Sequence, residues 1–294
     1  MSIRMSAAVV LPLITGLALV MANVSAAADS PTRCSVAVTG QGPDIILVPG
    51  LATPGDVWDA TVKHLASNHR VHVVQVAGFG GTDAGANRAD DDMLPALVAE
   101  IAQYAATLER PAIIGHSLGG LIALEVAARQ PDSISRVLVV DALPFYALTI
   151  SPAATVDMAK PMATMIRTQL MAQTDAQYSA SAPMTANRLA KSASGRASVT
   201  RWAAASDRVV VGKAMYEDML TDARPQLPQI HAKTTVLYAF DSTMGVPPAM
   251  LDSLYTAAYR NLAGVELKRI DGSYHFIMLD QPDAFLSELD AFLK

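Results

Sequence analysis

The sequence contains a single cysteine, Cys34, among 294 residues. One thiol excludes an internal disulfide, and it also excludes a zinc or iron–sulfur site built from several thiolates. The formal net charge is −5 at pH 7, and aromatic residues make up 5% of the chain. No basic patch with interleaved aromatic residues occurs, so we expect no nucleic-acid partner. The fold must therefore be stabilised by packing.

Long apolar runs are scarce, and the run near the start is short for a membrane span. It extends from Val9 to Met21, follows Arg4, and precedes a stretch of small residues that reaches Ala28. This order is typical of a secretory signal peptide. We expect residues 1–28 to be a signal peptide that is cleaved after Ala26 or Ala28. The mature protein would then be periplasmic or secreted, without a stable membrane anchor; an uncleaved anchor is the alternative.

Beyond residue 28, apolar β-branched runs alternate with helical patterns. This alternation predicts an α/β fold in which helices cover both faces of a mostly parallel sheet. A further segment over residues 34–39 could add an antiparallel edge strand. The other expected strands are Ile45–Val48, Val71–Val76, Ala112–Ile114, Val137–Val140, Thr234–Ala239 and Val265–Ile270.

The strand pattern stops between Pro144 and Ile230, where the sequence is helix-like and holds seven of the fourteen methionines. We expect residues 144–230 to form a helical cap or lid, and residues 29–143 and 231–294 to form the core. Methionine side chains adapt to varied shapes, so they suit an apolar pocket under a lid, although they could equally fill a helical core.

A serine lies between two glycines in the stretch Gly115-His116-Ser117-Leu118-Gly119-Gly120, directly after an expected strand. A strand that turns sharply into a helix at such a serine leaves its hydroxyl free at the top of the turn. Glycines two residues before and after the serine would relieve crowding of the backbone there. Ser117 is therefore the candidate nucleophile. The alternative is a purely structural role, in which the serine only caps a glycine-flanked helix.

A serine hydroxyl is a weak nucleophile, so it needs a neighbouring base and a third group that orients this base. His275 follows the last expected strand in the loop 271–276. The carboxyl ends of parallel strands share one edge of the sheet, which would bring this imidazole to the edge that carries Ser117. We predict that His275 is the general base.

Two aspartates are candidates for the orienting acid. Asp241 follows the strand after the expected cap and gives the chain order Ser, Asp, His. Asp141 ends the strand before the cap and could reach the same imidazole from the neighbouring strand. The chain order favours Asp241, and Asp141 stays as the alternative acid.

Acyl transfer also needs N–H donors for the oxyanion that forms. The backbone N–H of Leu118, the residue after the nucleophile, is one candidate. The other is Leu51, because Pro49 has no N–H and Gly50 lets the backbone turn inward. These residues imply no metal, nucleotide or flavin cofactor.

In this order the motifs resemble an α/β-hydrolase-fold serine hydrolase with a helical cap, over nearly the whole chain after the signal. The family often has His-Gly where this chain has Pro49-Gly50, and its acid usually stands one residue later than Asp241, where this chain has Ser242. The second departure keeps Asp141 open. The matching segments are Leu47–Leu51, Trp58, Gly78–Gly80, Gly115–Gly120, Asp241 and His275 with Asp280–Pro282.

The resemblance implies an α/β-hydrolase fold with the cap inserted between late strands. It also implies a carboxylesterase-like serine hydrolase that cleaves a small to medium carboxylic ester through an acyl-enzyme, and the expected signal peptide makes this an exported enzyme. A lactonase, such as one for acyl-homoserine lactones, or an amidase would use the same triad. A ligand-binding receptor without turnover is the alternative of another class. The sequence predicts neither the identity of the small-molecule substrate nor the oligomeric state.

Overall fold

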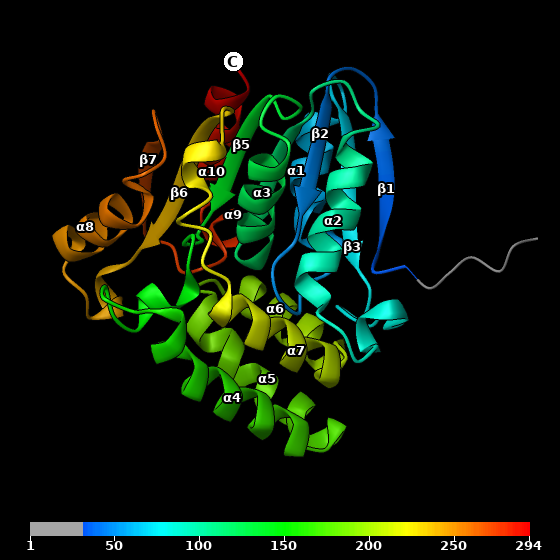
Figure 1. Cartoon of the computed structure of the whole chain (residues 1–294), viewed down its shortest axis with the longest axis vertical. Helices are drawn as coiled ribbons and strands as arrows, with labels where there is room; N and C mark the ends of the chain where they lie inside the picture. The colour runs from blue at the N-terminus through cyan, green and yellow to red at the C-terminus, as the bar shows by residue number, and fades with distance from the viewer. Residues whose placement is uncertain (1–31) are drawn as a thin grey trace, which may run out of the picture. The chain divides into compact units, whose positions relative to one another are not determined.

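The computed structural model describes residues 32–294, so the expected signal peptide lies outside the described residues. These residues form a seven-stranded sheet in the order β1-β3-β2-β4-β5-β6-β7 (Figure 1). β2 to β7 run parallel, whereas β1 pairs antiparallel with β3 at one edge. The predicted α/β architecture is confirmed. The strands are β1 Cys34–Gly40, β2 Asp44–Val48, β3 Arg70–Val76, β4 Ala112–His116, β5 Arg136–Val140, β6 Lys233–Phe240 and β7 Glu266–Asp271.

The central strands are buried on both faces, which explains why they appear in the sequence as unbroken apolar runs. In β2, Ile46 and Val48 pack into the apolar layer on one face of the sheet. Ile45 and Leu47 point the other way and pack into the opposite layer. The same alternation holds in β4 and β5, so the middle of the sheet is shielded from water.

Helices form both of these apolar layers (Figure 1). One layer includes α2 (Met93–Ala105), α3 (Leu118–Arg129) and α8 (Pro248–Tyr259). The other includes α1 (Asp59–Leu65) and α10 (Pro282–Leu293), which follows the short α9 (Ile277–Asp280). None of the helices within residues 32–294 is long and apolar enough to cross a membrane.

Four helices occupy the chain between β5 and β6 and lie beyond the carboxyl ends of the strands (Figure 1). Three of them begin at a hydroxyl side chain that accepts a hydrogen bond from the first turn, and α7 begins at Asp207, which does the same. We call these four helices the cap. They are α4 Val156–Ala172, α5 Asp175–Leu189, α6 Ala193–Ala205 and α7 Arg208–Leu220.

Most methionines of the cap are exposed, although Met219 is fully buried. Their exposure gives no support to the interpretation that they line an apolar pocket. The exposed ones are Met158, Met162, Met165, Met171 and Met184.

Glycines allow α3 to start directly against the backbone of β2 and β4. A Cβ atom on Gly115 would lie 2.0 Å from the carbonyl oxygen of Gly119. A Cβ atom on Gly119 would lie 2.3 Å from the carbonyl oxygen of Val48. Because backbone atoms cannot move aside cheaply, these contacts fix where the helix begins relative to the sheet.

We expect Gly115→Ala to lower the free energy of unfolding by at least about 2 kcal/mol, because the added methyl group overlaps backbone atoms. Urea unfolding of both proteins measures this difference. Gly212→Ala is the matched control, since its Cβ atom would lie 3.6 Å from that of Leu170. Within α7, this control should be neutral or stabilising by about 0.5–1 kcal/mol. Equal effects of the two substitutions would contradict the steric argument.

Candidate active site

The parallel strands bring all four predicted side chains to one edge of the sheet. Ser117 follows β4, Asp141 follows β5, Asp241 follows β6, and His275 lies in the loop after β7. In an open sheet of this kind, ligands bind beyond the carboxyl ends of the strands. The cap lies at the same edge (Figure 1).

Ser117 lies at a sharp turn between strand and helix, as its sequence context predicts. Its backbone has φ 55° and ψ −124°, a conformation that non-glycine residues rarely adopt. The Ser117 N–H donates a hydrogen bond of 3.0 Å to the carbonyl oxygen of Val140, which ties the turn to the neighbouring strand. The side chain is half-buried rather than enclosed. A strained turn of this kind presents a serine hydroxyl at the top of the sheet.

His275 forms a hydrogen-bonded pair with Asp141. Its Nδ1 atom lies 2.7 Å from Asp141 Oδ2. The other oxygen, Oδ1, accepts hydrogen bonds from the Ala239 N–H at 2.8 Å and from the Tyr255 hydroxyl at 3.2 Å. Both carboxylate oxygens therefore have partners, and the imidazole is left with Nε2 as the nitrogen available for proton transfer.

The backbone of His275 is held by the residue that precedes the serine. His116 Nε2 donates a hydrogen bond of 3.0 Å to the carbonyl oxygen of His275. His116 is fully buried, and burial lowers the pKa of its imidazole well below the usual range, with the nearby His275 as a second cause. His116 is therefore neutral, and its proton resides on Nε2. The strand that carries Ser117 thus also positions the loop that carries the histidine.

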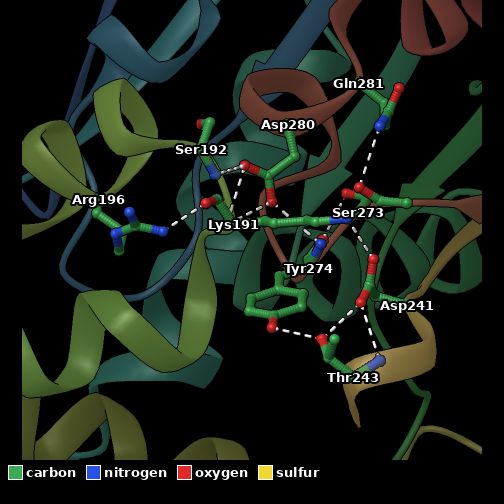
Figure 2. A network of polar contacts seen from close by, with 10 residues as sticks. Lys191, Ser192, Arg196, Asp241, Thr243, Ser273, Tyr274, Asp280 and Gln281 are labelled. Carbon is green, nitrogen blue, oxygen red and sulfur yellow. Dashed lines mark hydrogen bonds and ion pairs between the residues drawn. The ribbon is translucent and has the colours of Figure 1, made fainter.

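The structure does not bring Asp241, the acid favoured by chain order, to the histidine. Asp241 Oδ2 instead accepts a hydrogen bond of 2.5 Å from Lys191 Nζ of the cap (Figure 2). Its Oδ1 accepts hydrogen bonds from the N–H and the hydroxyl of Thr243. Hydrogen bonds from Lys191 and Thr243 lower the pKa of Asp241 to about 2. The geometry therefore favours the alternative acid, Asp141.

The loop after β2 lies against Ser117, the candidate nucleophile. A Cβ atom on Gly50 would lie 2.9 Å from His116 Nδ1 and 3.0 Å from the Cβ atom of Ser117, so the backbone at Gly50 packs closely against these two side chains. Leu51 follows directly, and Leu118 opens α3, where the first N–H groups of a helix have no partner within the helix. The two predicted oxyanion donors thus belong to the segments that flank Ser117 on either side.

Sequence analysis missed Asp218, which lies in α7 of the cap with 7% of its surface exposed. Burial raises the pKa of the Asp218 carboxyl to about 7, and the charge of His275 opposes this rise. An aspartate inside a helix of mixed composition gives no sequence signal of its burial.

The described residues do not meet the requirements of a metal site. Across residues 32–294, no group of three or more histidine, cysteine, aspartate or glutamate side chains is arranged to hold a metal ion.

Comparison with known proteins adds to this geometry. Residues 45–288 match the alpha/beta hydrolase family. The chain is 30% identical over 269 residues to the pimeloyl-[acyl-carrier protein] methyl ester esterase of Vibrio atlanticus, an alignment that covers 87% of this chain and 96% of that protein. It is 37% identical to the Aeromonas hydrophila protein of the same name over 112 residues, which is 38% of this chain and 42% of that protein.

Solved structures show the same fold at lower sequence identity. The enol-lactonase of Burkholderia xenovorans superposes with a TM-score of 0.69 at 20% identity, covering 88% of this chain and 96% of that one. A hydrolase of Oleispira antarctica superposes with a TM-score of 0.71 at 17% identity, covering 88% and 94%.

Asp141→Asn and Asp241→Asn separate the two candidate acids. We expect Asp141→Asn to lower kcat for p-nitrophenyl butyrate by ~10³–10⁴, because an amide cannot hold the imidazole in the required tautomer. Asp241→Asn should lower kcat by less than about tenfold, since Asp241 contacts Lys191 and Thr243 rather than His275. Steady-state kinetics with both variants measures this, and the reverse order of effects would restore Asp241 as the acid.

Asp218→Asn tests the buried acid through stability. An acid whose folded pKa is about 7 keeps its proton in the folded state while the unfolded state loses it near pH 4. The wild type therefore loses stability, by at most about 4 kcal/mol, as the pH rises from 4 to 7. The uncharged variant should escape this loss. Urea unfolding at pH 4.5 and pH 8 measures it, and a stability difference that does not change with pH would contradict burial of the acid.

Proposed function

Since this chain belongs to the alpha/beta hydrolase family, we propose that it is an exported serine hydrolase that cleaves a small to medium carboxylic ester through an acyl-enzyme. That the chain is an ester-cleaving hydrolase agrees with its relatives, which are esterases. The observation that carries the mechanism is the His275–Asp141 pair at 2.7 Å, at the sheet edge where Ser117 stands on its strained turn.

In the proposed mechanism, His275 Nε2 takes the proton of the Ser117 hydroxyl as its oxygen attacks the ester carbonyl carbon. Asp141 holds the opposite ring nitrogen and stabilises the imidazolium that forms. The N–H groups of Leu51 and Leu118 stabilise the oxyanion, and His275 then protonates the departing alcohol. Water activated by the same histidine releases the acid from Ser117 in the second half of the reaction.

The relatives support one class of substrate within this reaction. The Vibrio atlanticus protein is named for a methyl ester on an acyl chain carried by a protein. We propose that the present chain likewise acts on a simple alkyl ester, and that free small-molecule esters are sufficient substrates.

Export is the second part of the proposal. It is supported by the order of Arg4, the apolar run Val9–Met21 and the small residues up to Ala28. Fractionation of cells that produce the full chain, beside cells that produce residues 29–294 alone, tests it. Export predicts that only the full chain reaches the periplasm or medium and that it arrives shortened; equal distribution of the two would overturn this part.

Ser117→Ala tests the chemistry. We expect this variant to lose at least ~10³ in kcat for p-nitrophenyl acetate, butyrate and methyl esters of medium chain length, because no other hydroxyl can replace the nucleophile. Rates at pH 7.5 and labelling of the wild type by a fluorophosphonate probe provide the measurements. The variant should retain the unfolding midpoint of the wild type within a few degrees. Full activity of a folded Ser117→Ala protein would rule out the serine mechanism.

A further inference from the structure

The carboxylate of Asp280 joins the loop that carries His275 to the cap. Asp280, the last residue of α9, accepts the N–H of Tyr274 on Oδ2 at 3.0 Å. The same carboxylate accepts the N–H of Lys191 at 2.8 and 3.0 Å and the N–H of Ser192 at 2.8 Å (Figure 2). One side chain thus joins the residue before His275 to the junction between α5 and α6 of the cap.

A second contact joins the same two segments on the other side of the histidine. The N–H of Phe276 donates a hydrogen bond of 3.2 Å to the carbonyl oxygen of Leu189, the last residue of α5. Phe276 is therefore bound to the cap directly, and Tyr274 is bound to it through Asp280. Together with the hydrogen bond from His116 to the His275 carbonyl, these contacts hold the peptide group that precedes Tyr274 and the peptide group that follows His275.

An ion pair fastens this junction to the core. Lys191 Nζ lies 2.5 Å from Asp241 Oδ2, and the Asp241 side chain is only 5% exposed. Asp241 is itself held at the end of β6 by the N–H and hydroxyl of Thr243, and the Thr243 hydroxyl lies 2.7 Å from the Tyr274 hydroxyl (Figure 2). The positive charge of Lys191 therefore bridges the cap to the core beside the histidine loop.

We propose that Asp280 is a positioning residue for His275, and that the Lys191–Asp241 ion pair makes this positioning depend on docking of the cap. In this arrangement the cap does more than cover the site: its α5–α6 junction forms part of the scaffold that holds the general base. When the junction leaves the core, Phe276 loses its hydrogen bond to Leu189, and Asp280, which binds the Tyr274 N–H, loses its hydrogen bonds from Lys191 and Ser192. The inference rests on the proposed function only where turnover is measured.

The experiment uses the whole mature chain and compares Asp280→Asn and Lys191→Met with the wild type. Asp280→Asn turns an amide group toward N–H donors, so we expect kcat for p-nitrophenyl butyrate to fall roughly ten- to a hundredfold while KM changes less than about threefold. Lys191→Met should cause a smaller fall in kcat. Asp280→Glu, which keeps the charge, should recover part of the loss. Lys233→Met is the control. It breaks an exposed ion pair with Glu266 at the amino ends of β6 and β7, whereas the site lies at the carboxyl ends.

Two further measurements do not depend on turnover. Neither would change if Asp280 only stabilised the fold without positioning His275. Hydrogen exchange should accelerate at the N–H groups of Tyr274 and Phe276 in both test variants, but not in Lys233→Met. The downfield proton resonance of His275 Nδ1–H, assigned by its loss in Asp141→Asn, should broaden or shift in Asp280→Asn.

The outcomes are distinct. Wild-type kcat together with an unchanged resonance in Asp280→Asn would overturn the proposal. If Asp280→Asn does not fold, unchanged exchange at Tyr274 and Phe276 in Lys191→Met would overturn it instead. A wild-type protein that hydrolyses no ester, yet shows the expected exchange and resonance changes, would overturn the proposed function and support the positioning role.

Discussion

The hydrogen bond between His275 and Asp141 is the interaction on which the arrangement of the site depends. It leaves Nε2 as the imidazole nitrogen available for proton transfer, and it brings the residue after β5 and the loop after β7 together. Asp141 has a positive φ of 49° at the exit of its strand. Its N–H donates to the carbonyl oxygen of Leu237, and its Oδ1 accepts from Ala239, both in β6. Asp141 is therefore held by hydrogen bonds to the neighbouring strand, and its other carboxylate oxygen pairs with His275.

Much of this fold could be predicted from the sequence, because buried parallel strands appear as apolar runs and the turn at Ser117 needs its glycines. The positions of Ser117 and His275 at the carboxyl ends of strands could be predicted for the same reason, because each follows a recognisable strand. The acid could not be decided in this way. Both Asp141 and Asp241 follow strands, and both lie between Ser117 and His275 in the chain. The order Ser, Asp, His, on which the preference for Asp241 rested, therefore holds equally for Asp141. The sequence did contain one indication against Asp241: the family usually has its acid one residue later, and this chain has Ser242 there.

What separates the two aspartates is their long-range partners. Asp241 has Lys191 of the cap as its partner, 50 residues earlier in the chain, and Asp141 has the histidine, 134 residues later. Neither pairing has a local pattern, since each depends on how the cap and the last strand dock on the sheet. Asp218 escaped prediction for the same reason: only the packed cap buries it. The methionines of the cap show that an apolar residue type likewise does not reveal burial. Their apolar character suggested a pocket, whereas five of them are exposed to solvent.

The position of Asp141 at the end of β5 also has a consequence for folding order. Ser117 follows β4 and Asp141 follows β5 of one continuous β4-α3-β5 unit. The positions of these two residues relative to each other are therefore set by contacts that are local in sequence, such as the hydrogen bond from the Ser117 N–H to Val140. The cap begins only after this unit, and the histidine arrives with the last strand. Local contacts close with a smaller loss of chain entropy than distant ones. Two members of the site can thus be set in place early, and the insertion can change length without moving them relative to each other.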